Sequence, residues 1–326
     1  MAFRLKLVPE ETNIDFFKAQ VVTFGVSTLL AVASVVCVLV MGLNFGIDFQ
    51  GGTTIRTEST EAVDVGAYRQ AVSGVVEGDV IITEVFDPNF RADQHVAMIR
   101  IGAQGEAESV TPATIDAVEQ ALKGVDGSIT FPSVESVGPK VSGELIQQAV
   151  LAVLAATAAI AVYVWLRFEW QFAIGAVVSL VHDVLITIGV FSLFQLRFDL
   201  SIIAALLTIV GYSINDTVVV FDRLRENLIK FKTTPLRELM NLSVNETLSR
   251  TVMTSGTTLI ALVALLVFGG DVIRGFVFAM TFGIVIGTYS SVYVAKNVVL
   301  WLGVKRDWTK TKDEGPAGTQ FATKAD

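Results

Sequence analysis

The sequence is short of charge, cysteine and histidine. Charged residues make up 17% of its 326 positions and hydrophobic residues 52%, whereas a soluble domain carries about 25% charged residues. A single cysteine excludes an intrachain disulfide framework, and two histidines are too few for a His-built zinc site. The net charge of -8 argues against nucleic-acid binding, and the high apolar content argues against disorder. An integral membrane protein is the first interpretation, and we expect neither a metal nor a cofactor.

Six apolar runs of 18 residues or more divide the chain. About 20 apolar residues cross the hydrocarbon core of a bilayer as an α-helix. The runs therefore predict a polytopic α-helical membrane protein with six transmembrane helices, at Val21–Met41, Ala149–Leu166, Phe172–Leu196, Leu200–Val220, Thr251–Phe268 and Phe276–Leu302.

Lysine and arginine favour one side of these spans. They gather before the first span, between the fourth and fifth, and after the sixth, while the opposite short loops hold only Arg197 and Arg274. Because cytoplasmic loops carry the excess of Lys and Arg, we expect both termini to be cytoplasmic. The long segment 48–144 then lies on the other side, and its 16 acidic and 6 basic residues account for the acidic balance.

Segment 48–144 is predicted to be a folded domain. Turn residues separate six elements whose order is βαββαβ, which indicates one ferredoxin-like α+β domain. The expected elements are the strand Thr53–Thr57, the helix Val63–Val75, the strands Val80–Phe86 and Val96–Ile101, the helix Pro112–Leu122 and the strand Ile129–Val134.

The predicted organisation has five parts. They are a cytoplasmic segment (1–20), the first transmembrane helix and its exit (21–47), the outer α+β domain (48–144), transmembrane helices 2–6 with a cytoplasmic loop at 222–249 (145–304), and a cytoplasmic tail (305–326). The tail is rich in Gly, Pro, Ala and Thr, and we expect its end to be disordered.

Ionisable residues inside the spans are the main candidates for function, because a charge at mid-membrane costs about 2.5–3.5 kcal/mol on insertion scales. Asp216 in the fourth span and Arg250 at the start of the fifth come at similar depth. A guanidinium that approaches or leaves a buried carboxyl changes its proton affinity, as a proton carrier requires. The alternative is a static ion pair that helps two helices to pack.

Further polar residues accompany this pair. Tyr212 and Ser213 share the helix face of Asp216, Asn215 precedes it, and Thr254 follows Arg250 by one helical turn. In the third span a polar face carries Ser179 and Asp183, with His182 beside it. These residues either form a second relay in a hydrated cavity or hold helices together by hydrogen bonds.

Small residues recur every four positions in the sixth span, where they include Gly283 and Gly287. Such a stripe permits close helix contact, so we interpret these glycines as packing positions. Lys296, near the cytoplasmic end of the same span, is expected to extend its ammonium group towards water.

Four segments carry a family resemblance. Gly46–Gly52 (GIDFQGG) leaves the first span and Gly138–Leu145 (GPKVSGEL) enters the second, while Gly211–Arg223 (GYSINDTVVVFDR) and Arg250–Thr258 (RTVMTSGTT) lie in the fourth and fifth. These segments resemble signatures of the SecD/SecF family, in the resistance-nodulation-division superfamily, and the last two resemble its SecF branch. Ser142 is a departure, since relatives often have Gly there.

The resemblance implies a function and a location. A SecF-type subunit forms a heterocomplex with SecD beside the SecYEG channel in the bacterial inner membrane, with the soluble domain in the periplasm and the other surfaces in contact with membrane lipid. The complex is understood to use the proton-motive force to promote late translocation of SecA-dependent polypeptides and their release on the periplasmic side. The subunit is not an enzyme, and the sequence contains no Gly-x-x-x-x-Gly-Lys loop for ATP.

The resemblance also implies residue roles. The acidic residue of the fourth-span motif and the arginine of the fifth belong to the family's proton path, and these positions are Asp216 and Arg250. The remaining signature residues act either as a hinge for the outer domain or as a tight turn entering a strand, and both interpretations stay open. They are Gly46, Asp48, Gly51, Gly52, Gly138 and Pro139.

Other classes of protein fit the sequence less well. An intramembrane aspartyl protease using Asp183 and Asp216 would need a Gly-x-Gly-Asp motif, which is missing. A serine hydrolase using Ser179 and His182 would need a nucleophile elbow. A passive assembly factor and a half-size solute exporter of the same superfamily are further alternatives.

Overall fold

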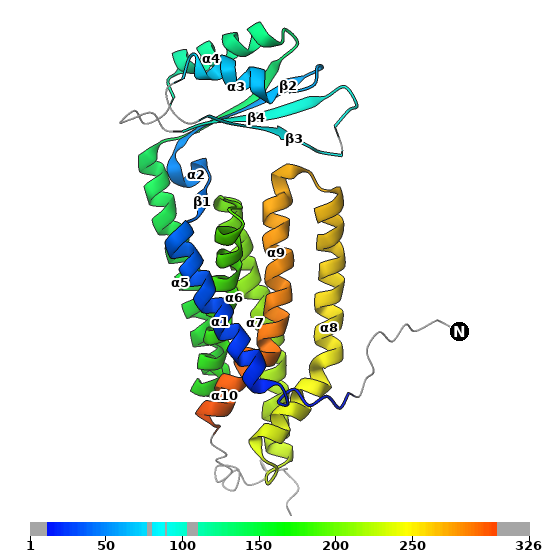
Figure 1. Cartoon of the computed structure of the whole chain (residues 1–326). Coiled ribbons are helices and arrows are strands. Elements are labelled where there is room, and N and C mark those ends of the chain that lie inside the picture. The colour runs from blue at the N-terminus through cyan, green and yellow to red at the C-terminus, as the bar shows by residue number, and fades with distance from the viewer. Residues whose placement is uncertain (1–11, 77–79, 89, 103–109, 305–326) are drawn as a thin grey trace, which may run out of the picture.

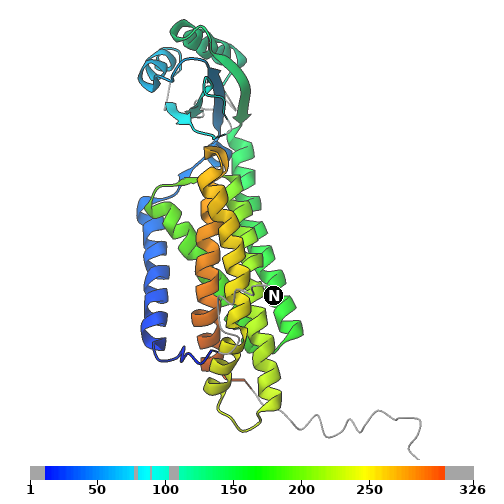
Figure 2. The same ribbon diagram turned by 90° about the vertical axis from the view of Figure 1, so that its right-hand side faces the viewer.

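The computed structural model describes residues 12–76, 80–88, 90–102 and 110–304. Long helices form a bundle, and an α+β domain lies at one end of it (Figure 1). The turned view places the first helix, α1, at the outer side of the bundle (Figure 2). The tail at 305–326 and the first eleven residues lie outside the described residues, so the expectation of a disordered tail stays a prediction.

The six predicted spans are confirmed as helices. Within the described residues, six helices are long and apolar enough to cross a membrane, the last of them interrupted by one π-helical turn, η1. The helices are α1 (Gln20–Met41), α5 (Pro139–Arg167), α6 (Trp170–Leu193), α7 (Leu200–Lys230), α8 (Leu236–Phe268), α9 (Asp271–Ser290), η1 (Ser291–Ala295) and α10 (Lys296–Leu302).

The helices α7 and α8 extend beyond their apolar runs. Segment 222–249, expected as a loop, is helical except at the connection 231–235. No glycine or proline occurs in it before Pro235, so no helix-breaking residue stops α7 at its last apolar turn; α7 continues to Lys230, and α8 begins directly after Pro235. Charged side chains, among them Arg223 and Glu246 at 2.7 Å, cover the extension.

The outer domain has one sheet with two helices on one face (Figure 1). Its elements are β2 (Gly52–Ser59), α3 (Val65–Ser73), β3 (Val80–Val85), β4 (His95–Gly102), α4 (Pro112–Val125) and β5 (Thr130–Val137). The strand order is β3-β4-β2-β5, and every neighbouring pair is antiparallel. Side chains of Asp64 and Thr111 cap the two helices. Apolar residues of both layers, including Ile55, Ile99 and Leu122, form the core.

A buried carboxylate ties β2 to the segment after α4. Asp126 accepts hydrogen bonds from the Ser59 hydroxyl, and from the Ser128 amide and hydroxyl at 2.8 and 2.7 Å. Burial alone would raise the pKa of Asp126, but the hydrogen bonds from Ser59 and Ser128 outweigh it and lower the pKa below its ordinary value.

Asp126 makes the stability of the outer domain depend on acid pH. A carboxyl whose pKa is lower in the folded state stabilises that state above its unfolded pKa of about 3.9, and this contribution is lost as pH falls through the folded pKa. We expect Asp126→Asn to cost about 1–3 kcal/mol at neutral pH and to flatten the loss of stability below pH ~4. Amide hydrogen exchange of β2 and α4 against pH measures both effects. An unchanged acid profile in Asp126→Asn would contradict the assignment.

The exit of the first span is a tight turn. The strand β1 (Asn44–Phe45) pairs in parallel with β6 (Arg197–Phe198), and the single-turn helix α2 (Ile47–Gln50) follows. Asp48 accepts a hydrogen bond from the Leu200 amide at 3.0 Å. Gly51 and Gly52 have φ angles of 75° and 128°, which residues with a Cβ atom rarely adopt.

The other signature residues lie close by or at the second junction. A Cβ atom at Gly46 would lie 3.2 Å from Asp199 Cβ. Gly138 precedes α5, and Pro139 is its first residue, where the fixed φ of proline suits a helix start. The geometry at Gly51 and Gly52 favours the turn, and a hinge role for these positions stays a prediction.

Candidate polar site between the spans

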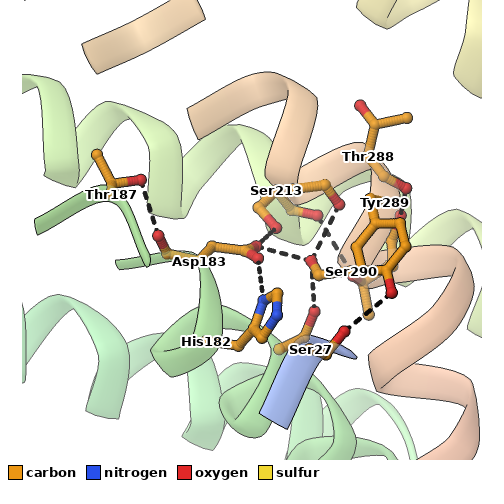
Figure 3. A network of polar contacts seen from close by, with 12 residues as sticks. Ser27, His182, Asp183, Thr187, Ser213, Thr288, Tyr289 and Ser290 are labelled. Atoms are coloured by element: carbon orange, nitrogen blue, oxygen red, sulfur yellow. Dashed lines mark hydrogen bonds and ion pairs between the residues drawn. The ribbon is translucent and has the colours of Figure 1, made fainter. Parts of the chain in front are cut away.

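Asp183 of α6 is the centre of a buried hydrogen-bond network (Figure 3). Its side chain is 1% exposed. One carboxylate oxygen accepts hydrogen bonds from the hydroxyls of Ser213 (α7) and Ser290 (α9) at 2.6 and 2.8 Å, and Ser179 donates to Ser290 at 2.9 Å. The other oxygen lies 2.9 Å from Nδ1 of His182. Three helices thus meet at one carboxylate.

His182 connects this network towards α1. Its ring stacks on that of Tyr289 with centroids 6.4 Å apart. The Tyr289 hydroxyl lies 3.0 Å from the Ser27 hydroxyl and donates to the Thr23 carbonyl at 2.8 Å (Figure 3). Nε2 of His182 is buried and has no hydrogen-bond partner among the described residues. A ring nitrogen of histidine can accept or donate a hydrogen bond, depending on the tautomer.

Asp216 of α7 is the second buried carboxylate, at 3% exposure. It accepts a hydrogen bond from the Ser255 hydroxyl (α8) at 3.3 Å, and that hydroxyl lies 2.7 Å from the hydroxyl of Thr288 (α9). Arg250 is exposed. No ion pair within 4.0 Å joins its guanidinium to Asp216 in the described ranges.

The predicted site residues therefore separate into three groups. Ser179, His182 and Ser213 gather around Asp183, so Ser213 bonds to that residue and not to Asp216. Tyr212 forms a separate contact with the hydroxyl of Thr258 at 3.1 Å. The remaining three candidates lie apart: Asn215 and Arg250 are exposed, and Thr254 donates to the carbonyl groups of Arg250 and Thr251 in its own helix.

Sequence reasoning missed several partners, namely Ser290, Ser255, Thr288, Tyr289 and Ser27. Single hydroxyl residues in apolar helices are common, and nothing marks which of them face a carboxylate. One spacing could have indicated a partner: Ser290 lies one helical turn after Gly287, on the face of α9 that packs against the other spans. A Cβ atom at Gly287 would lie 3.5 Å from a carboxylate oxygen of Asp183.

The small-residue stripe of α9 packs within this chain. A Cβ atom at Gly283 would lie 2.6 Å from Cγ1 of Ile209, and one at Gly287 would lie 3.0 Å from Cβ of Ser213. Both neighbours belong to α7. The close approach brings Ser213 and Ser290 to the same carboxylate, so the glycines position the polar site.

The expectation that Lys296 extends to water is wrong. The side chain is fully buried at the start of α10. Its ammonium group donates to the Phe16 carbonyl at 3.2 Å and lies 4.1 Å from the centroid of the Phe17 ring. A carbonyl and aromatic faces replace water around the cation.

Lys296 thereby holds a strap formed by Thr12–Phe17. Two asparagines of α8 bind the same strap: Asn245 accepts from the Ile14 amide at 2.8 Å, and Asn241 accepts from the Phe16 amide at 2.9 Å. The strap precedes α1 and bonds to both α8 and α10.

The polar site places ionisable side chains and hydroxyl groups between apolar helices. Asp183, Asp216 and His182 are ionisable and are bordered by hydroxyl groups that both donate and accept hydrogen bonds. No group of three or more His, Cys, Asp or Glu side chains suited to a metal occurs in the portion of the chain that the structure covers.

These features define a polytopic membrane protein with ionisable side chains between its spans. The family model "Protein export membrane protein SecD/SecF, C-terminal" matches residues 117–305, and the "SecD/SecF GG Motif" matches residues 38–63. The chain therefore belongs to the SecD/SecF family of protein export membrane proteins.

Individual relatives agree with this. The chain is 74% identical over 322 residues to Protein translocase subunit SecF of Cereibacter sphaeroides, with 99% of each chain covered. It is 43% identical over 299 residues to the subunit of the same name from Rhodothermus marinus, covering 90% of this chain and 94% of the relative.

A solved structure is also similar. It is that of SecDF, a translocon-associated membrane protein, from Thermus thermophilus. The TM-score is 0.79 at 36% identity, and the match covers 91% of this chain. The chain spans only 39% of the length of that structure, so it corresponds to one part of a longer chain.

Proposed function

We propose that this chain is the SecF-type subunit of a SecDF complex in the bacterial inner membrane. It uses the proton-motive force to promote late translocation of SecA-dependent polypeptides through the SecYEG channel and their release into the periplasm. The observation that carries the proposal is the pair of buried carboxylates, Asp183 and Asp216, each bonded to hydroxyls of other spans. Moving one elementary charge through 100 mV is worth about 2.3 kcal/mol. A proton that crosses the membrane by way of such groups would therefore make this energy available for movement of the spans.

The fold supports the arrangement of this complex. This chain matches 39% of the SecDF chain. In this proposal, a SecD subunit corresponds to the rest of that chain. The exposed apolar faces of α1 and α8, with Val21 at 86% and Ile260 at 72%, suit lipid or the spans of SecD.

The orientation and the domains follow from the same proposal. Both termini are cytoplasmic and 48–144 is periplasmic, as the distribution of Lys and Arg favours. We also propose the five-part division given by the sequence, with two differences: α5 begins at Pro139, and segment 222–249 is helical except at 231–235. The strand order β3-β4-β2-β5 supports classifying the periplasmic domain as ferredoxin-like.

Asp216 is the principal proton carrier in this proposal, and Arg250 approaches it in another state of the cycle. Arg250 precedes Ser255, the residue of α8 that donates to Asp216, by five residues, so we infer that a rotation or shift of α8 against α7 brings the guanidinium towards the carboxylate. The hydroxyls of Ser255 and Thr288 hold Asp216 in the state described.

The test is late translocation in inner-membrane vesicles that contain this chain, SecD and SecYEG. We expect a stalled secretory polypeptide to complete translocation faster with a proton gradient, and an ionophore that collapses the gradient to remove the gain. Vesicles without this chain control for other proton-driven steps. If the chain accelerates translocation equally with and without a gradient, the passive assembly factor is the better description.

A further inference from the structure

The outer domain touches the spanning helices at a second place besides its covalent junctions. The end of β3 meets the turn between α8 and α9, as both views show (Figures 1 and 2). The Phe86 amide donates to a carboxylate oxygen of Asp271 at 2.7 Å, and the Asp271 amide donates to the Phe86 carbonyl at 3.0 Å. A Cβ atom at Gly270 would lie 3.2 Å from Cβ of Asp87. One residue of the turn thus pairs reciprocally with one residue of the domain.

Asp271 is well placed for this contact. It is the first residue of α9, where a carboxylate is favoured by the helix dipole. Its other carboxylate oxygen pairs with the Arg274 guanidinium one turn later, at 2.5 Å. One oxygen of Asp271 thus pairs with Arg274, and the other accepts from Phe86 and faces the domain.

The turn joins α8 and α9, and this helical hairpin contacts Asp216, the proposed proton carrier. Only Gly269 and Gly270 connect α8 to α9. Within the hairpin, Ser255 of α8 and Thr288 of α9 are 2.7 Å apart, and Ser255 donates to Asp216. A shift of the hairpin against α7 therefore moves the Asp216 partners and Asp271 together, because helices are rigid along their length.

The contact is small enough to open. Two hydrogen bonds join Phe86 to Asp271, and Gly270 approaches Asp87 closely beside them. A cavity of about 310 Å³ lies beside it, lined by Asp87, Leu265, Phe268, Val272 and Ile273 with the two glycines. Exposed polar hydrogen bonds contribute little net free energy because water replaces them, so the domain can leave the turn without a large cost.

We propose that Asp271 is a positioning residue that docks the outer domain on the α8–α9 turn and transmits movement of this hairpin to the domain. The inference rests on the proposed function, because it assigns the link between the proton site and the part of the chain outside the membrane. Docking and release alternate as the hairpin shifts with protonation of Asp216. The outer domain then moves about its junctions with α2 and α5.

A disulfide across the contact tests this proposal. Cysteines at Asp87→Cys and Gly270→Cys, in a Cys37→Ser background, have Cβ positions about as close as a disulfide requires. We expect the bond to form in vesicles with SecD and to lower the gradient-dependent rate of translocation roughly fivefold or more, with reductant restoring it. We also expect the yield of the bond to change when the gradient is applied, which reports docking without any translocation assay.

The control is Thr53→Cys with Ser136→Cys in the same background. The native hydroxyls of this pair are 2.6 Å apart on β2 and β5, so the bond stays within the outer domain. It should leave the gradient-dependent rate unchanged. A fully oxidised 87–270 bond that leaves the rate unchanged would overturn the proposal, as would failure of the bond to form.

Single variants of Asp271 separate docking from folding. Asp271→Asn keeps an acceptor for the Phe86 amide, whereas Asp271→Ala removes it. We expect Asp271→Ala to weaken gradient-dependent translocation and Asp271→Asn to retain most of it, at equal membrane abundance of both. Equal rates for the two variants would contradict a positioning role. If the native chain shows no gradient-dependent gain but the 87–270 yield still responds to the gradient, the proposed function fails and the docking contact stands.

Discussion

Asp216→Asn is expected to reduce translocation in vesicles to the rate seen without a proton gradient. Asparagine keeps an oxygen that accepts the hydrogen bond from Ser255 and is nearly the same size as aspartate, so the α7–α8 contact survives. What the variant loses is the ability to bind and release a proton. The expected loss is therefore confined to the gradient-dependent part of the rate, and membrane abundance stays normal.

The matched control is Asp222→Asn on the same helix. Its carboxylate pairs with Arg167 at 2.9 Å, and both side chains are 45% exposed. An exposed ion pair contributes little to stability, so this variant should translocate like the native chain. If Asp216→Asn translocates faster with a proton gradient, as the Asp222→Asn control does, then Asp216 is not the proton carrier.

Gly189→Val is expected to separate α1 from the bundle. A Cβ atom at Gly189 would lie 2.7 Å from the Cα atom of Ser34, and a backbone atom cannot move aside as a side chain can. The whole of α1 would have to shift away from α6. Overpacking of this kind costs about 1–3 kcal/mol, and here it also pulls Ser27 away from Tyr289.

Unfolding of the purified chain in detergent measures this effect. Gly25→Val on α1 is the matched control, since nothing in the described part of the molecule lies within 4 Å of a Cβ atom there. Adding Ser34→Gly to Gly189→Val should recover part of the loss, because it removes Cβ and the hydroxyl but not the Cα atom. Equal stability of the two valine variants would show that α1 and α6 do not pack this closely.

The sequence predicts the spans well because long apolar runs have few alternatives in a membrane. It predicts helix ends poorly, since the polar continuation of α7 to Lys230 and the start of α8 at Leu236 carry no apolar signal. It also predicts the order of elements in the outer domain, because most of the turn residues that separate the predicted strands and helices lie between the strands and helices of the structure.

The site was harder to predict for a physical reason. Asp183 and Asp216 stand out because charge is rare in spans, but the hydroxyls that donate to them come from other helices, at separations of 30 to 107 residues. Ser213 is an example: it was expected to accompany Asp216, three residues later, but its hydroxyl bonds to Asp183. The prediction for Lys296 was wrong for the same reason, because its partner Phe16 lies 280 residues away.

The strap at Thr12–Phe17 has a consequence for biosynthesis. The strap leaves the ribosome before Asn241, Asn245 and Lys296, which bind it and are made more than 220 residues later. Chains are made from the N-terminus onwards and fold as their partners appear, so the end of the bundle opposite the outer domain closes only after the sixth helix is in place. A nascent chain that stops before Lys296 would lack the bond from Lys296 to the strap. We expect a protease to cleave Thr12–Phe17 more readily in that chain than in one that includes the sixth helix.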